Sequence, residues 1–197
     1  MDRSGAGNGN RGRGAPDSDL PMCQFRVLPE NSAVLIEARS NVGPISFGTS
    51  VLTGSLLARL EGDTFATQVI PVAELTVDLR SLTSGNALYD AELVQRLNVR
   101  MHPFSTVVLR GLRAMLSSAS DQRFTASGDL NLHGVTKEIS GTLSVARSGS
   151  RAFSISGQHE FDIRDFDIPT PSVLMLHIYP RVRVHLQLEV TAVSEQN

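Results

Sequence analysis

Apolar and polar residues alternate along most of this chain from Phe25 onward, and no other feature constrains the fold as strongly. Successive side chains of a strand point to opposite faces of its sheet, so a period of two is typical of half-buried strands. In residues 124–133 one face carries Phe124, Ala126, Gly128, Leu130 and Leu132. After a short turn, polar residues alternate with Ile139, Gly141, Leu143 and Val145. The two runs predict an antiparallel hairpin with one apolar and one polar face.

The same alternation predicts strands in other parts of the chain. Their apolar faces carry Val34, Ile36 and Ala38; Leu75, Val77 and Leu79; Phe153, Ile155, Phe161 and Ile163; and Val182, Val184, Leu186, Leu188 and Val190. Residues 52–60 form a further expected strand. In each case the intervening residues are mostly polar, so each sheet face is again either apolar or polar.

One segment breaks this period and predicts a helix over residues 87–99. Leu93, Val94 and Leu97 follow helical spacing, and the preceding Ser-Gly-Asn, residues 84–86, supplies start signals. Pro103 disfavours helical backbone angles at the residue before it, so we expect the helix to end near Arg100.

These elements predict an all-β fold, an antiparallel eight-stranded barrel with one α-helix between strands. The chain has 197 residues, of which 41% are hydrophobic, which is enough for one domain with a real core. No helices alternate with the strands, which excludes a parallel sheet, and closure into a barrel removes exposed sheet edges. Residues 23–197 form the expected barrel. Residues 1–22 consist mainly of Gly, Arg, Asp, Asn and Ser and offer too little apolar surface to bury, so we expect a disordered tail there.

Composition excludes several classes of partner. Eighteen basic residues against twenty acidic ones give a net charge of −2, which argues against a nucleic-acid binder. No apolar run reaches the ~18 residues of a membrane-spanning helix, so we expect no membrane insertion. The single cysteine, Cys23, excludes an intramolecular disulfide. Together with the lack of an apolar signal segment, the lone thiol favours a cytoplasmic location.

The apolar faces predict an interior that is either filled or hollow. Small residues lie among large ones on the inward faces, namely Gly54, Ala58, Ala126, Gly128, Gly141 and Gly157. Such a mixture is compatible with a tapered core that side chains fill completely. It is equally compatible with a slot that holds a thin apolar guest. About ten buried methylenes contribute roughly 8 kcal/mol, at ~0.8 kcal/mol each, against an association cost of about 4 to 15 kcal/mol. A long guest therefore binds better than a short one.

No residue pattern predicts catalysis or a metal site. The chain lacks a G-x-S-x-G motif, and alternation separates His159 from Glu160 and Asp162 across the sheet. We interpret the acidic residues around Arg164 as a salt-bridged strand end. We interpret His133, Gly134 and Thr136 as a turn, with contact between a ligand head group and His133 or Lys137 as the alternative. Arginines 80, 96, 100, 110 and 113 form either a solvated surface or a cationic rim.

Four segments resemble the YceI-like family. The strongest is Gly-Asp-Leu-Asn-Leu-His-Gly-Val-Thr-Lys-Glu-Ile at residues 128–139; the others are residues 79–86, 90–103 and 161–168, in the family's order. The resemblance covers residues 25–193. It implies an extended, lipocalin-like barrel that stores or carries a polyisoprenoid, a quinone or a fatty amide without catalysis. It also implies that dimers are common.

We therefore predict a binding protein whose partner is a long-chain apolar ligand, with no cofactor other than that bound lipid. The apolar faces predict the residues that line its cavity: Leu75, Val77, Leu130, Leu132, Phe153, Ile155, Phe161, Val184 and Leu186. The alternatives are a filled barrel that acts as a protein-interaction or stress-response module, and an enzyme or metal-binding barrel with a polar cluster inside.

Overall fold

The structure is a computed structural model that describes residues 22–62, 64–66, 69–117, 121–170, 172–173 and 176–193. The predicted disordered tail, residues 1–22, lies outside the described residues except for Met22, which is the first residue of a strand. The strands are β1 Met22–Val27, β2 Ala33–Ser40, β3 Gly43–Thr49, β4 Leu52–Glu61, β5 Thr64–Phe65, β6 Val72–Asp78, β7 Phe104–Ser117, β8 Asp121–Leu132, β9 Val135–Arg147, β10 Ala152–Asp162, β11 Ser172–Val173 and β12 Leu176–Ala192. The helices are the 3-10 turns η2 Pro29–Asn31, η3 Leu79–Ser81 and η4 Ile163–Phe166, and α1 Ala87–Arg96.

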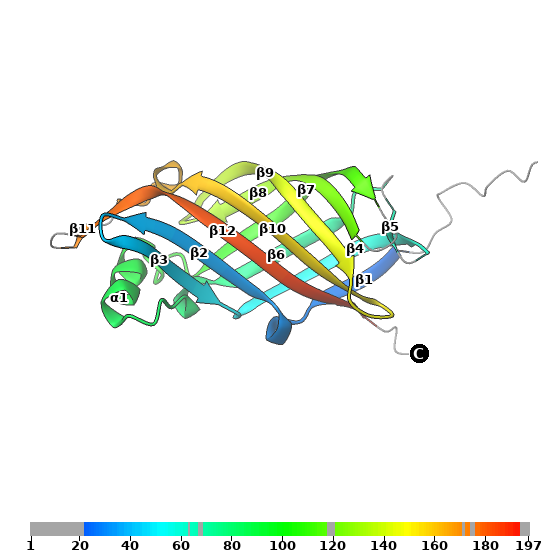
Figure 1. Ribbon diagram of the computed structural model, residues 1–197, viewed down its shortest axis with the longest axis horizontal. Coiled ribbons are helices and arrows are strands. Elements are labelled where there is room, and N and C mark those ends of the chain that lie inside the picture. Colours follow the sequence, from blue (N-terminus) through cyan, green and yellow to red (C-terminus); the bar gives the residue numbers. More distant parts are fainter. Residues whose placement is uncertain are drawn as a thin grey trace, which may run out of the picture.

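Eight antiparallel strands close into a barrel, as the alternation predicts (Figure 1). The ring runs β1-β4-β6-β7-β8-β9-β10-β12 and is closed by pairing of β1 with β12, where Phe25 lies opposite Ala192. The long strand β12 also pairs with β2, which carries the hairpin β2–β3. Because β12 holds both β1 and β2 along one edge, the barrel is extended at the end where β3 and α1 lie.

Burial follows the alternation in the central hairpin β8–β9. Phe124, Ala126, Leu130 and Leu132 are buried on β8, and Thr125 between them is exposed. The strands pair without a register shift from Asp121↔Ala146 to Leu132↔Val135. The turn is His133–Gly134, two of the three residues that the sequence indicates for it, whereas Thr136 already belongs to β9.

The helix α1 starts where the sequence predicts and ends earlier. The Asn86 side chain accepts hydrogen bonds from the backbone of Leu88 (3.0 Å) and Tyr89 (3.4 Å), which caps the first turn. The helix ends at Arg96, because Asn98 has φ 45° and cannot continue it. Asp90 accepts hydrogen bonds from Thr83 and Ser84 at 2.6–2.8 Å. These bonds fix α1 beside β3, to which Thr83 is bridged through Gly48.

The strand β7 does not carry the period of two along its whole length. Its register with β8 shifts between Leu109 and Gly111, and again between Ala114 and Leu116. Each β-bulge inserts one extra residue, which exchanges the inward and outward positions after it. Val107 and Leu109 line the barrel interior before the first bulge, and Leu112 does so after it.

Two apolar clusters fill the ends of the barrel. One is built around Phe25, Phe124 and Phe153, near β1 and β5. The other contains Phe166 and Leu82 and lies near η3 and η4. None of the helices in the described part of the chain combines the length and apolarity required to cross a membrane.

Candidate functional site

A cavity of about 300 Å³ lies inside the barrel, lined by members of both apolar clusters. Its walls are mainly aliphatic and aromatic. The buried hydroxyl of Ser105 on this wall donates a hydrogen bond of 2.8 Å to the carbonyl of Asn131. Of the described residues that line the cavity, Glu74 alone carries a formal charge at neutral pH, and its side chain is exposed at the surface. The cavity therefore offers a mainly apolar environment.

Eight of the nine residues that the sequence predicts for the lining do line this cavity. They are Leu75, Val77, Leu130, Leu132, Ile155, Phe161, Val184 and Leu186, on strands β6, β8, β10 and β12. Phe153 is the exception, because it packs behind the cavity in an aromatic cluster with Phe25 and Phe65.

This aromatic cluster closes one end of the cavity. The ring centroids of Phe25, Phe65 and Phe153 lie 4.5–5.7 Å apart in tilted and edge-to-face arrangements. Phe65 belongs to the short strand β5 and also lines the cavity. The buried amide of Gln122 holds it there, since its Oε1 accepts from the backbone of Phe65 at 3.0 Å and its Nε2 donates to the same residue's carbonyl at 3.3 Å. A buried polar side chain thus fixes an apolar end wall.

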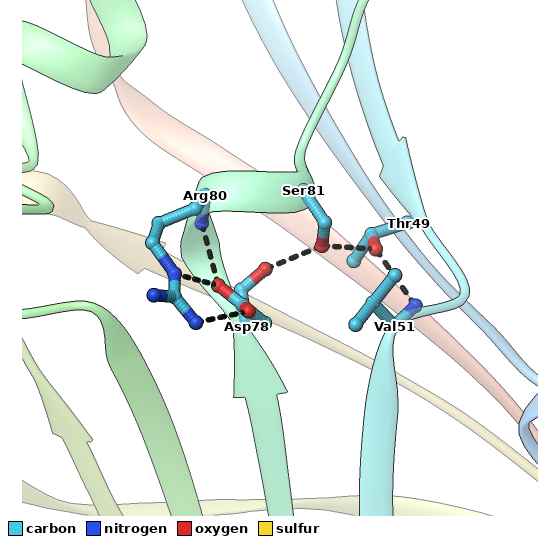
Figure 2. Close-up of polar contacts among 5 residues, drawn as sticks. All are labelled: Thr49, Val51, Asp78, Arg80 and Ser81. Carbon is cyan, nitrogen blue, oxygen red and sulfur yellow. Dashed lines mark hydrogen bonds and ion pairs between the residues drawn. The ribbon is translucent and has the colours of Figure 1, made fainter.

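At the opposite end, η3 places Leu79 and Leu82 against the cavity. Figure 2 shows how this turn is fixed: Asp78, at the end of β6, accepts from the backbone and guanidinium of Arg80 at 2.6–3.0 Å. Ser81 is 2.6 Å from Thr49, whose hydroxyl accepts from the backbone of Val51 at 2.9 Å. The network joins the junction of β3 and β4 to η3. The hydrogen bonds from Arg80 lower the pKa of Asp78.

The turn η4 repeats this arrangement after β10. Asp162 accepts from the backbone of Arg164 (2.9 Å) and forms two contacts with its guanidinium at 2.6 and 2.9 Å. These side-chain hydrogen bonds lower the pKa of Asp162 to about 2. The salt-bridged strand end that the sequence indicates around Arg164 is therefore present. Both caps direct apolar side chains inward, Leu79 after the first and the buried Phe166 after the second.

Several of the other polar candidates have structural partners. His133 Nδ1 lies 3.1 Å from the carbonyl oxygen of Phe166, and the Asn131 amide donates to Thr136 at 2.8 Å. Three of the five arginines considered for a cationic rim are paired: Arg80 with Asp78, Arg96 with Glu92, and Arg110 with Asp129. No group of three or more His, Cys, Asp or Glu side chains within the described residues is placed to hold a metal ion.

His159 is a lining residue that the sequence reasoning missed. It lies on β10 between Gly157 and Phe161, and all three line the cavity. Its ring stacks 6.1 Å from that of Phe161. The alternation in the sequence already indicates this position, because His159 is an even number of residues from Ile155 and Phe161. Its side chain therefore lies on the same inward face of the strand.

The comparisons with known proteins agree with this architecture. BcnA of Burkholderia cenocepacia has a similar structure with a TM-score of 0.67 at 16% identity, covering 83% of this chain and 98% of that one. A polyisoprenoid binding domain from Saccharophagus degradans, implicated in plant cell wall breakdown, also gives a TM-score of 0.67, at 17% identity over 86% and 98%. The Campylobacter jejuni YCEI protein gives 0.53 at 16% identity, over 72% and 82%.

At these identities the solved structures establish a shared fold. No curated protein sequence matches the chain. The model of the YceI-like domain matches residues 25–190, which comprise the whole barrel ring apart from the ends of β1 and β12. The chain belongs to the YceI-like family.

Proposed function

We propose that this protein binds the apolar chain of an amphiphile, an isoprenoid or acyl chain, inside its barrel and releases it unchanged. The observation that carries the proposal is the apolar cavity of about 300 Å³ inside the barrel. This volume lies at the lower end of the range of about 300 to 1,000 Å³ in which proteins bind small molecules. The Saccharophagus degradans domain, described as polyisoprenoid binding, supports the choice of an isoprenoid.

The cavity also weighs against the alternative of a barrel with a filled interior. Both ends are packed, by the Phe25 cluster at one end and by Leu79 and Leu82 at the other, whereas the middle is left open. Each methylene that enters this space contributes roughly 0.8 kcal/mol. Binding then depends on how much of the chain is enclosed, and the proposal includes no covalent step.

Two matched variants on β8 test this function. Ala126 lines the cavity, whereas its neighbour Thr125 is exposed on the outer face. Ala126→Leu fills part of the cavity and leaves the protein folded, because filling a cavity commonly stabilises a core. Thr125→Leu adds an apolar side chain of the same size outside the barrel.

The measurement is a fluorescence titration with N-phenyl-1-naphthylamine, which emits strongly in apolar surroundings. We expect Ala126→Leu to weaken binding by about tenfold or more, equivalent to ~1.4 kcal/mol, and Thr125→Leu to leave it unchanged. Equal affinity in the two variants would show that the probe binds elsewhere and would contradict the proposal.

A further inference from the structure

The wall of the barrel splits between β9 and β10. These two strands are paired from Phe153↔Arg147 to Gln158↔Thr142. Beyond that point β9 remains paired with β8 over residues 135–141, and β10 remains paired with β12 over residues 159–162. All of these residues are described, and no pairing joins the two stretches. We call the space between them the side gap.

The side gap is bounded at both ends. At its narrow end lies Gly141, where an added Cβ would be 3.3 Å from the carbonyl oxygen of Gln158 and 4.0 Å from His159 Nδ1. At its wide end lies η4, which contacts both β9 and β10. The buried ring of Phe166 in this turn packs edge-to-face against Phe161 at 5.1 Å. Packing at both ends makes the gap a defined opening.

Two cavities meet at the side gap. The apolar cavity is lined there by the consecutive residues 139–143 of β9, including the outward-facing Ser140 and Thr142. Gly157, Gln158 and His159 of β10 line the same cavity from the other side, so it extends to both edges of the gap. A second pocket of about 250 Å³ lies at the same place, and it shares Ile139, His159 and Phe161 with the first.

The second pocket is lined mainly by polar and charged residues, whereas the first is lined mainly by apolar ones. Its remaining lining residues are Lys137, Glu138, Glu160, Asp165 and Phe166. His159 stands at the boundary, half-buried, with its ring stacked on Phe161 inside. An apolar chamber that leads past one imidazole into a polar pocket has the form of a site for an amphiphile, with the tail inside and the head outside.

The charges around the second pocket select the class of head group. Lys137 is opposed by three carboxylates, Glu138, Glu160 and Asp165. Glu160 is neutralised by Arg183, whose Nε lies 2.7 Å from its Oε1, and Arg39 and Arg181 act on the same carboxylate. Arg39, Arg181 and Arg183 are not among the residues that line this pocket. On its described lining the carboxylates outnumber the single cation, Lys137, so a diphosphate would meet more negative than positive charge there. An uncharged hydrogen-bonding head meets donors and acceptors there without this repulsion.

We propose that the side gap is the portal through which the ligand enters and leaves, and that the second pocket holds an uncharged head group, a hydroxyl or an amide, beside His159. This inference rests on the proposed function and adds to it the route and the head-group class.

A crosslink across the side gap tests the portal. In a Cys23→Ser background, which removes the only native thiol, Ser140→Cys and Glu160→Cys place thiols on the two sides, two residues beyond the last pair. Ser144→Cys and Ser156→Cys, opposite each other in the paired part of the same strands, form the control. Each variant is treated with a short bis-maleimide and, separately, with N-ethylmaleimide, and thermal unfolding verifies that it is folded.

The readout is the release of N-phenyl-1-naphthylamine on mixing with excess farnesol. We expect the crosslink across the gap to slow release about tenfold or more relative to N-ethylmaleimide treatment, and the control crosslink to change it less than about twofold. Equal release rates from the two crosslinked proteins would overturn the portal. Failure of the unmodified protein to bind the probe would instead overturn the proposed function.

Two ligands with the same tail test the head-group class. We expect the full chain to bind farnesol about tenfold or more tightly than farnesyl diphosphate. His159→Leu should weaken farnesol binding about fivefold through the loss of one hydrogen bond. His177→Leu, an exposed histidine outside both pockets, should leave it unchanged. Equal or tighter binding of the diphosphate, or unchanged farnesol binding by His159→Leu, would overturn the head-group assignment.

Discussion

Two residues in the left-handed backbone region make the turn between β8 and β9. His133 has φ 54° and Gly134 has φ 81°, and two successive positive φ angles match the twist of a hairpin. A Cβ on Gly134 would lie 2.7 Å from Cε1 of His102, whose ring covers the turn. His133 is held by the carbonyl of Phe166. Backbone conformation and packing thus explain the His-Gly pair, which is central to the resemblance to the family, without a ligand contact.

We predict that Gly134→Ala lowers the free energy of unfolding by more than the ~1 to 2 kcal/mol of left-handed strain alone. Gly85→Ala is the matched control, because Gly85 has φ 78° and open space around its Cα. Urea unfolding of both variants measures the difference, which reports the contact with His102. Equal losses in the two variants would show that the ring moves aside at no cost.

Two strands of the barrel end in the same device, an aspartate that caps a 3-10 turn and is bound by the arginine two residues later. Asp78 and Arg80 end β6, and Asp162 and Arg164 end β10. Each turn directs the chain across an end of the barrel and buries apolar side chains there, so local capping determines where the cavity stops.

The cap of η4 predicts a pH dependence of stability. The pKa of Asp162 is lowered to about 2 in the folded protein, so its contribution is complete above the unfolded value of about 3.9 and is lost as the pH falls toward 2. The Asp162→Asn variant lacks this contribution at every pH. We expect the stability difference between wild type and variant, measured by urea unfolding, to shrink between about pH 4 and pH 2. A constant difference over that range would contradict the assignment.

The sequence predicted the elements that keep a strict period and missed the places where the period is broken. The faces of β8, β9 and β12 followed from alternation alone. The strand β7 did not, because two bulges exchange its inward and outward positions. The helix end was placed too late, because Asn98 adopts a conformation that its residue type permits without requiring. The side gap depends on where two strands stop pairing, which residue alternation does not encode.

At the scale of the whole molecule, the ring is closed by the first and last strands. Phe25 on β1 is fully buried, and its ring packs against those of Phe65 and Phe153. Its backbone lies opposite Ala192 of β12, in the strand pair that closes the ring. One side chain therefore links closure of the barrel to the end wall of the cavity. A homodimer and a cytoplasmic location remain predictions, which sedimentation equilibrium and cell fractionation test directly.

We predict that Phe25→Ala lowers the free energy of unfolding by about 3 to 5 kcal/mol, since it removes a buried aromatic side chain from a closed core. Phe104→Ala is the control: its ring is 47% exposed and lies 5.2 Å from the guanidinium carbon of Arg80, so we expect a loss of about 1 kcal/mol or less. Chemical unfolding measures both. A small loss for Phe25→Ala would show that the cluster does not support closure.

Native mass spectrometry of the purified full chain, followed by solvent extraction, tests most directly whether the barrel is a container for an apolar molecule. We expect one amphiphile of defined mass per barrel in the wild type and in Thr125→Leu, and a bare chain in Ala126→Leu. A wild-type protein that is recovered without a lipid and that fails to take up farnesol when it is supplied would contradict the account.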